Sequence, residues 1–450
     1  MGVASPFRCA FEDGSRGSIF ECVCCIRNSR YGSTALRGCL SGRSGNARII
    51  TQAGEQNMTV DTKVQYARMG ARLIDHVKNG TTDWAADTME VPSSSYTDPD
   101  QWQREMDHIF KSQPILVGIS QEIPEAGDFK TLNMLGVPLL ITRQKDGSAK
   151  VLMNVCTHRG MQLTAEPCGN QKLFSCPYHG WTFKADGSLR AVADAPKFGE
   201  VCEGARDLVQ FPSHEEGGLI FAVLTPDSDV DIRAFLGGMM DDVAAKGMDE
   251  WTYVGNRVIH GPNWKVAYDG YLEGYHFKAA HPETIEPRTY SNVMEYDAHG
   301  PHLLVGFAAK NMMTLGEVEQ NELWQHETRG YDFIRLFFPN VSIFVAPEIT
   351  QVAQMIPGPG PMENTTILHF LHPKPPENDE DNAARIEMAD WLRDVVQEED
   401  YNVGLKLQEG LATGLMKSVL LGRNERGNQY FHRWVKWFAD GDESAPKPEL

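Results

Sequence analysis

The chain has 450 residues, of which 41% are hydrophobic, so it can bury ordinary cores and its length predicts about two or three domains. Its formal net charge is −19, with 61 acidic against 42 basic residues. An acidic surface argues against a nucleic acid or an anionic membrane as partner. No apolar run approaches the roughly 18 residues of a membrane-spanning helix.

The first 57 residues differ in composition from the rest of the chain. They hold seven Arg, no Lys, seven Ser and five of the nine cysteines. Three interpretations stay open: a non-native extension before a true start at Met58, an Arg- and Ser-rich transit peptide, and a disordered native tail. An odd number of cysteines in a large acidic chain does not indicate a disulfide framework, which favours a reducing, cytoplasmic location.

Residues 58–112 are predicted to form an N-terminal helical segment that packs on the domain at 227–450. A second helix of this segment is expected around Gln101–Phe110. The first helix shows apolar residues every three or four positions: Tyr66, Met69, Leu73 and Val77.

From residue 113 to 226 the pattern changes to short β runs, separated by turn signals such as Asp146-Gly147. This segment is expected to be a small all-β domain, either a sandwich or a barrel-like fold. The predicted strands are Pro114–Ile119, Val137–Arg143, Ala149–Asn154 and Gly218–Leu224.

Residues 227–450 combine strands with long helices. Strands of an antiparallel sheet are predicted at Phe333–Pro339, Val341–Pro347 and Thr366–Leu371, and a long helical stretch covers 381–414. Strands followed by a covering helix predict a helix-grip (START-like) domain. The fold class predicted for the whole chain is therefore α+β.

Two Cys–His pairs lie in the predicted β domain. The pairs are Cys156-Thr-His158 and Cys176-Pro-Tyr-His179. Two thiolates on one iron and two imidazoles on the other are the ligands of a Rieske [2Fe–2S] centre. A zinc finger uses the same residue types in the order Cys, Cys, His, His. The alternating order here favours one [2Fe–2S] cluster over zinc.

A second constellation consists of Glu273, His276 and His281. Two histidines and one carboxylate on one face of an iron leave positions open for O₂ and substrate. Glu273 and His276 are expected to share a helix face. His276 and His281 would point about 140° apart on an ideal helix. The helix must therefore distort or end before His281, and Pro282 gives a reason, because the residue before proline disfavours helical geometry.

The carboxylate that completes this site is expected in the helix around 390–411. Asp400 and Glu399 both lie on or beside its apolar stripe, where a metal would satisfy a buried carboxylate. Periodicity does not choose between them, and the acidic run 397–400 is also compatible with a solvated face. The stripe predicted to be buried consists of Leu392, Val395, Val396, Val403, Leu407 and Leu411.

Taken together, these motifs resemble those of the large (α) subunits of Rieske non-heme iron oxygenases, the aromatic-ring-hydroxylating family. The resemblance implies a Rieske domain at 113–226 ahead of a catalytic domain at 227–450, with a mononuclear Fe(II) held by His276, His281 and Asp400. The matching motifs are Cys156-x-His158-Arg-Gly, Cys176-Pro-Tyr-His179-Gly-Trp181, Asn263-Trp264-Lys265, Glu273-x-Tyr275-His276-x-x-x-x-His281, and more weakly Glu399-Asp400 with Gln408-x-Gly410-Leu411.

The resemblance also implies a head-to-tail homotrimer or a multiple of it, with or without a β subunit. In such an assembly the cluster of one copy serves the iron of the next, and Glu273 would bridge His179 of one copy and His276 of the other. The family usually has Asp at this bridging place, and Gly270 stands where the family has Asn. Family members with a bridging Glu include enzymes that act on aliphatic or quaternary-amine substrates.

The predicted function is that of a terminal oxygenase, which hydroxylates an organic, expected aromatic, substrate with O₂. One alternative is a monooxygenase or demethylase for a non-aromatic or quaternary-amine substrate, and a second is a Rieske electron-transfer protein without oxygenase activity. No G-x-G-x-x-G lies between a predicted strand and helix, so a separate NAD(P)H-linked reductase is expected, with or without a ferredoxin. Aromatic and Met residues in strands more often belong to the plain core, but five of them are candidates for a substrate pocket: Phe307, Met312, Met313, Phe337 and Phe338.

Overall fold

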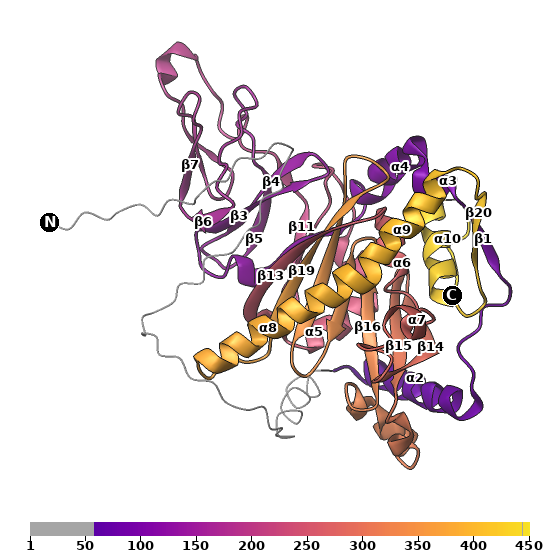
Figure 1. The fold of residues 1–450 in the computed structure, drawn as a ribbon. Coiled ribbons are helices and arrows are strands. Elements are labelled where there is room, and N and C mark those ends of the chain that lie inside the picture. Colours follow the sequence, from indigo (N-terminus) through magenta and orange to yellow (C-terminus); the bar gives the residue numbers. More distant parts are fainter. Residues whose placement is uncertain (1–57, 443) are drawn as a thin grey trace.

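The computed structural model describes residues 58–442 and 444–450, so the expectations for residues 1–57 lie outside the described residues (Figure 1). The predicted α+β class is confirmed: a small β domain projects from a larger domain built on an antiparallel sheet. None of the helices in the described part of the chain combines the length and apolar character that a membrane span requires.

A seven-stranded sheet with antiparallel neighbours forms the centre of the larger domain. Three of its strands were predicted, and the others were not. One reason is that β18 is buried along its whole length, so it lacks the alternation that marks a strand with one exposed face. The order is β13 (Thr252–Gly261), β19 (Asn364–His372), β18 (Thr350–Pro357), β17 (Val341–Val345), β16 (Tyr331–Phe337), β15 (His302–Ala309) and β14 (Thr289–His299).

One long helical rod lies diagonally across this sheet (Figure 1). It consists of α8 (Asp379–Val395), the π-helical turn η7 (Val396–Tyr401) and α9 (Asn402–Ala412), close to the predicted stretch 381–414. Side chains of α8 and η7 belong to the same hydrophobic cluster as β15, β18 and β19. This rod is therefore the long helix that covers the sheet in the predicted helix-grip domain.

The predicted apolar stripe of this rod is partly wrong. Val403 and Leu407 are 53% and 48% exposed, whereas Gly404 and Gln408 are buried in their place. The reason is the π turn, which inserts one extra residue and shifts the buried face from Val403 and Leu407 to Gly404 and Gln408, while Leu411 stays buried as predicted. Sequence periodicity assumes a uniform helix and does not reveal such an insertion.

The opposite face of the sheet is covered by α2 (Val60–Asn79) and α5 (Ile232–Ala245). The expectation that 58–112 is helical throughout is wrong in its middle part. There, β1 (Met89–Pro92) pairs antiparallel with β20 (Ser418–Leu421), a distant partner that no local pattern indicates. Helical turns resume at α3 (Ser94–Thr97), α4 (Pro99–Glu105) and η1 (Met106–Phe110), around the expected second helix.

The small β domain contains three sheets and stands at the end of the larger domain (Figure 1). Leu116 ties it to the central sheet, because its N–H donates to Asn340 Oδ1 at 3.0 Å and its carbonyl accepts from Gln354 Nε2 at 2.7 Å. The three sheets are β10-β5-β4-β3-β6 (Gln210–Phe211, Ala149–Met153, Val137–Arg143, Asp128–Met134, Cys168–Asn170), β11-β12-β2 (Ser213–Glu216, Leu219–Ala222, Ile115–Ile119) and β7-β8-β9 (Leu173–Ser175, Thr182–Lys184, Leu189–Ala191).

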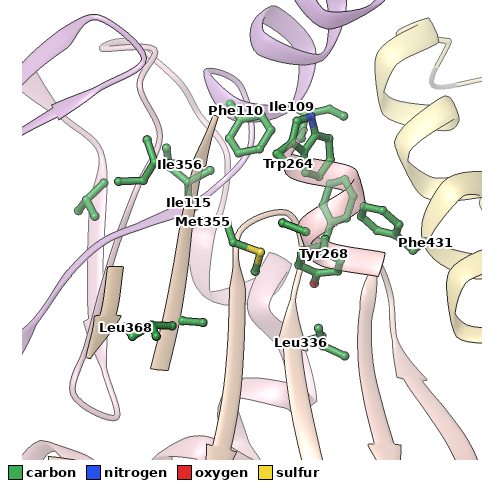
Figure 2. Close-up of a cluster of buried hydrophobic side chains, with 14 of the residues drawn as sticks. Ile109, Phe110, Ile115, Trp264, Tyr268, Leu336, Met355, Ile356, Leu368 and Phe431 are labelled. Carbon is green, nitrogen blue, oxygen red and sulfur yellow. The ribbon is translucent and has the colours of Figure 1, made fainter. Parts of the chain in front are cut away.

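The Asn-Trp-Lys motif opens helix α6 (Trp264–Asp269) and fixes it in the core. Asn263 accepts from Lys265 N–H at 2.7 Å as the N-terminal cap, and Trp264 Nε1 donates to buried Glu105 at 2.9 Å. Figure 2 shows Trp264 and Tyr268 of α6 among aromatic and aliphatic side chains, with Phe431 alongside. These contacts anchor α6, and they therefore fix the point at which the chain enters the motif of Glu273, His276 and His281.

Candidate metal centres

The two Cys–His pairs form two matching turns at one end of the small β domain. In the first, Cys156 N–H donates to Met161 O at 2.8 Å and Gly160 N–H donates to Cys156 O at 2.9 Å. In the second, Cys176 N–H donates to Trp181 O at 2.7 Å and Gly180 N–H donates to Cys176 O at 2.9 Å. Gly160 and Gly180 have φ of 76° and 69°, which requires glycine-like freedom.

These turns bring all four predicted cluster residues together. The His158 and His179 ring centroids are 4.8 Å apart, and Cys156 and Cys176 are both buried in the same small cluster. Burial raises the pKa of the Cys156 thiol, while the N–H groups of His158 and Arg159 lower it. Backbone donors are thus directed at this sulfur, as a thiolate ligand requires.

One atom of this group carries direct information about a ligand. His179 Nδ1 is buried and has no hydrogen-bond partner among the described residues. A buried ring nitrogen without a partner is costly, and metal coordination would satisfy it. The two buried thiols, the paired imidazoles and this open nitrogen fit a [2Fe–2S] cluster.

The second motif folds differently from the expectation of one helix face. Helix α6 ends at Asp269, and Glu273 lies in an irregular bend rather than on a helix with His276. Only one helical turn follows, α7 (Phe277–Ala280), with His276 before it and His281 after it. His281 has φ −120° and ψ 46°, so the chain leaves helical geometry there, as Pro282 led us to expect.

This short turn places both imidazoles around one carboxylate. Asp400 Oδ1 lies 2.8 Å from His281 Nε2 and 3.4 Å from His276 Nε2. One ligand atom from each of the three residues lies within 4.8 Å of the others. Two imidazoles and a carboxylate that leave other positions open are the donor set of non-heme iron oxygenases.

Each histidine also meets a second carboxylate through its other ring nitrogen. Glu273 accepts from His276 Nδ1 and, at 3.1 Å, from the His276 backbone N–H. Glu399 accepts from His281 Nδ1 at 2.6 Å and from the Thr284 hydroxyl at 2.5 Å. An outer carboxylate fixes the ring orientation and leaves Nε2 free for a metal. Asp400 and Glu399 thus take different positions, a distinction that periodicity did not make.

The imidazoles and carboxylates of this site shift one another's pKa values. Burial opposes protonation of His276, but hydrogen bonds with Asp400 and Glu273 raise its pKa to about 10. Burial likewise opposes protonation of His281, yet Asp400 and Glu399 raise its pKa. Burial of Asp400 is outweighed by the two imidazoles, which lower its pKa. A divalent cation would therefore replace protons on imidazoles that already face a carboxylate.

Only one of the five candidate pocket residues lies beside this site. The Phe307 ring is 5.4 Å from that of Phe277, which lies 5.0 Å from the His276 ring. Met312 and Phe337 belong to the cluster on the other face of the sheet. Phe337 does so because successive strand residues face opposite sides, whereas Met312 lies in the short 3-10 turn η5 (Met312–Leu315). Met313 is exposed, and Phe338 stacks on Phe438 in the core.

Two family models match this chain. The Rieske [2Fe-2S] domain matches residues 113–212, and the ring hydroxylating alpha subunit (catalytic domain) matches residues 248–441. The chain belongs to the Rieske non-heme iron oxygenases. Its cofactors are accordingly one [2Fe–2S] cluster and one mononuclear iron.

Curated relatives of this oxygenase fall into two groups. It is 34% identical over 199 residues to toluate 1,2-dioxygenase subunit alpha of Pseudomonas putida, a match that covers 41% of this chain and 43% of that subunit. It is 26% identical over 357 residues to the carnitine monooxygenase oxygenase subunit of Escherichia coli (strain K12), covering 76% of this chain and 91% of the relative.

A solved structure shares the fold. A quaternary ammonium Rieske monooxygenase in complex with L-carnitine aligns with a TM-score of 0.65 at 22% identity, over 79% of this chain and 96% of that chain. At this identity the likeness shows the architecture alone.

Proposed function

We propose that Cys156, His158, Cys176 and His179 hold the [2Fe–2S] cluster and that His276, His281 and Asp400 hold the mononuclear iron. The open His179 Nδ1 supports the first assignment. Convergence of both His Nε2 atoms on Asp400 Oδ1 supports the second, and is the observation on which the proposal rests.

When bound, the cluster supplies electrons one at a time, and the iron supplies the positions at which O₂ and substrate meet. The protein residues orient these groups. Glu273 and Glu399 hold the Nδ1 protons of His276 and His281, which directs both Nε2 atoms inward. Thr284 in turn fixes Glu399, so the outer shell is itself anchored.

The two centres are proposed to work together between copies in a homotrimer or a multiple of it, with or without a β subunit. Within one copy, β7 and α7 lie in different parts of the molecule (Figure 1). Large apolar side chains are exposed at both places: Tyr178 (58%) and Phe198 (43%) near the cluster motif, and Tyr275 (60%) beside Glu273. Docking of these surfaces would place His179 of one copy near Glu273 of the next.

The reaction proposed is hydroxylation of an organic substrate with O₂ and electrons from a separate NAD(P)H-linked reductase, with or without a ferredoxin. Aromatic dioxygenation remains the first candidate from the family resemblance. Monooxygenation of a quaternary amine is the second candidate. It is supported by the match to the carnitine monooxygenase oxygenase subunit, which covers 91% of that relative. The cytoplasmic location stays a prediction.

The test is a reductase-coupled turnover under ¹⁸O₂ with panels of arenes, aryl ethers and quaternary amines. Two labelled oxygens in the product indicate dioxygenation, and one labelled oxygen or released formaldehyde indicates monooxygenation. His281→Ala serves as control, because it should retain the cluster's visible absorption and lose product formation. Failure of the wild-type enzyme to oxidise any compound, with both centres loaded, would contradict the proposal.

A further inference from the structure

Tyr401, the residue directly after Asp400, packs the end of the π turn against the central sheet. It is the last residue of η7, and its side chain is 2% exposed. The ring lies against Gly261 at the end of β13, where a Cβ on the glycine would be 2.6 Å from Tyr401 Cδ2 and 2.7 Å from Cε2. Non-bonded carbon atoms prefer separations of about 3.5–4.0 Å, so only glycine at position 261 leaves room for this ring.

The Tyr401 hydroxyl begins a chain of hydrogen bonds that ends on the backbone just before α6. It lies 2.7 Å from Thr366 Oγ1 on β19. Thr366 donates its only hydroxyl proton to Asn364 Oδ1 at 2.9 Å, so the Tyr401 hydroxyl is the donor to Thr366. Asn364 Nδ2 donates in turn to Pro262 O at 2.5 Å. The Tyr401 hydroxyl therefore has one defined direction, toward the sheet.

Helix α9 contacts the same loop, which joins β13 to α6, through two further residues. Gly404 approaches Pro262 so closely that a Cβ on Gly404 would lie 2.9 Å from Pro262 Cγ. Gln408 Oε1 accepts from the Asn263 backbone N–H at 2.6 Å. Tyr401, Gly404 and Gln408 have the spacing i, i+3, i+7 of one helix face. The π turn thus directs this face at the loop.

The same loop leads through α6 to both histidines of the triad. Asn263 caps α6, which ends at Asp269, and the chain then continues to His276 and His281. The segment that carries Asp400 and the segment that carries the histidines are therefore fixed to one loop. His281 Nε2 and His276 Nε2 lie 2.8 Å and 3.4 Å from Asp400 Oδ1, so a small shift of the π turn would separate these atoms.

We propose that Tyr401 is a positioning residue that holds Asp400 at the mononuclear iron site. A π turn interrupts the regular hydrogen bonding of a helix, so contacts outside the helix must fix its position. The ring of Tyr401 sets where the turn lies on the sheet, and the hydroxyl fixes the orientation of the ring. The inference rests on the proposed function, because it takes Asp400 and the two histidines as the iron ligands.

The experiment measures the Fe(II) affinity of the protein with its cluster loaded, by competition with a graded chelator. Loss of an outer partner of a metal ligand costs about 10- to 100-fold, and the Tyr401 hydroxyl acts one step further out. Tyr401→Phe should therefore weaken iron binding about three- to tenfold. Gly261→Ala keeps the hydroxyl but displaces the ring, and should weaken iron binding about tenfold.

Tyr331→Phe is the matched control. Tyr331 is also fully buried and donates to Leu323 O at 2.7 Å, but it packs in the cluster on the other face of the sheet. Its variant should lose stability in urea unfolding as Tyr401→Phe does, because each loses one buried hydrogen bond. The iron affinity of Tyr331→Phe should stay that of the wild type.

A spectroscopic signal separates a positioning role from a general loss of stability. Nitric oxide is added to the Fe(II) enzyme, and the rhombicity of the electron paramagnetic resonance signal reports the geometry of the iron ligands. Tyr401→Phe and Gly261→Ala should change this rhombicity, and Tyr331→Phe should not. Both measurements are made where urea unfolding shows that the variants are folded.

Wild-type iron affinity together with an unchanged signal in folded Tyr401→Phe would overturn the proposal, and so would equal weakening in Tyr331→Phe. Tyr401→Phe removes a single oxygen atom, so it decides the question if Gly261→Ala does not fold. His281→Ala in the same assay tests the ligand assignment separately. If that variant keeps its iron, the proposed ligand set fails; if it loses iron while Tyr401→Phe behaves as wild type, only the positioning role fails.

Discussion

Glu399 offers the sharpest test of how the outer carboxylates act on the iron site. It accepts from His281 Nδ1 at 2.6 Å and from Thr284 at 2.5 Å, while Asp400 meets His281 Nε2 from the other side at 2.8 Å. Removal of an outer partner of a metal-binding histidine typically costs about 10- to 100-fold in metal affinity. Glu399→Gln keeps an oxygen that can accept from Nδ1 but loses the charge, so we expect a loss of about tenfold, or roughly 1.4 kcal/mol. Glu399→Ala should fall nearer the upper limit of about 100-fold.

The assay is competition for Fe(II) with a graded chelator, followed by iron counting per chain, with the cluster's absorption as internal reference. Glu398→Gln is the matched control, because Glu398 is exposed and accepts from Asn402 at 2.6 Å. It should behave as the wild type. Equal iron affinity of the Glu399→Gln and Glu398→Gln enzymes would refute the positioning role of Glu399.

Three further predictions follow from the same geometry. Glu273→Gln should leave both centres loaded yet slow oxidation of the reduced cluster in single-turnover kinetics, because the carboxylate that accepts from His276 is lost; unchanged kinetics would count against the bridge. Iron uptake by the iron-free protein should strengthen as pH rises from 6 to 8, because His276, whose pKa is raised to about 10, must release a proton; a calorimetric titration that shows no proton release would contradict this. Asp242→Ala should lower the free energy of unfolding in urea by about 3–5 kcal/mol, because it leaves the fully buried Arg335 short of a counter-charge. Asp241 is exposed, so Asp241→Ala is the control and should cost at most about 1 kcal/mol. Equal effects of the two substitutions would show that the buried pair has no special role.

Much of the fold and the grouping of the site residues could be anticipated from local sequence, because Cys–His turns and a histidine before proline carry short-range signals. Strand β18, buried along its length, and the β1–β20 pair, whose partners are far apart in the chain, depend on tertiary packing. The π turn at 396–401 was equally invisible, since it breaks the periodicity by which helices are recognised. That turn also placed Glu399 and Asp400 on opposite sides of His281, which no count of residues could have decided.

The sequence could not tell which candidate pocket residues lie beside the triad, for a related reason. Phe307 and Phe337 are both apolar strand residues, and only the register of the sheet decides which face each one joins.

The central claim is that one chain holds two separate iron centres on the residues named above. Iron and acid-labile sulfide counted on anaerobically reconstituted protein test it most directly. The account predicts about three irons and two sulfides per chain, about two irons in His281→Ala with the cluster intact, and about one iron in Cys176→Ser. A wild-type chain with a single zinc, or a His281→Ala enzyme with its iron content unchanged, would contradict it.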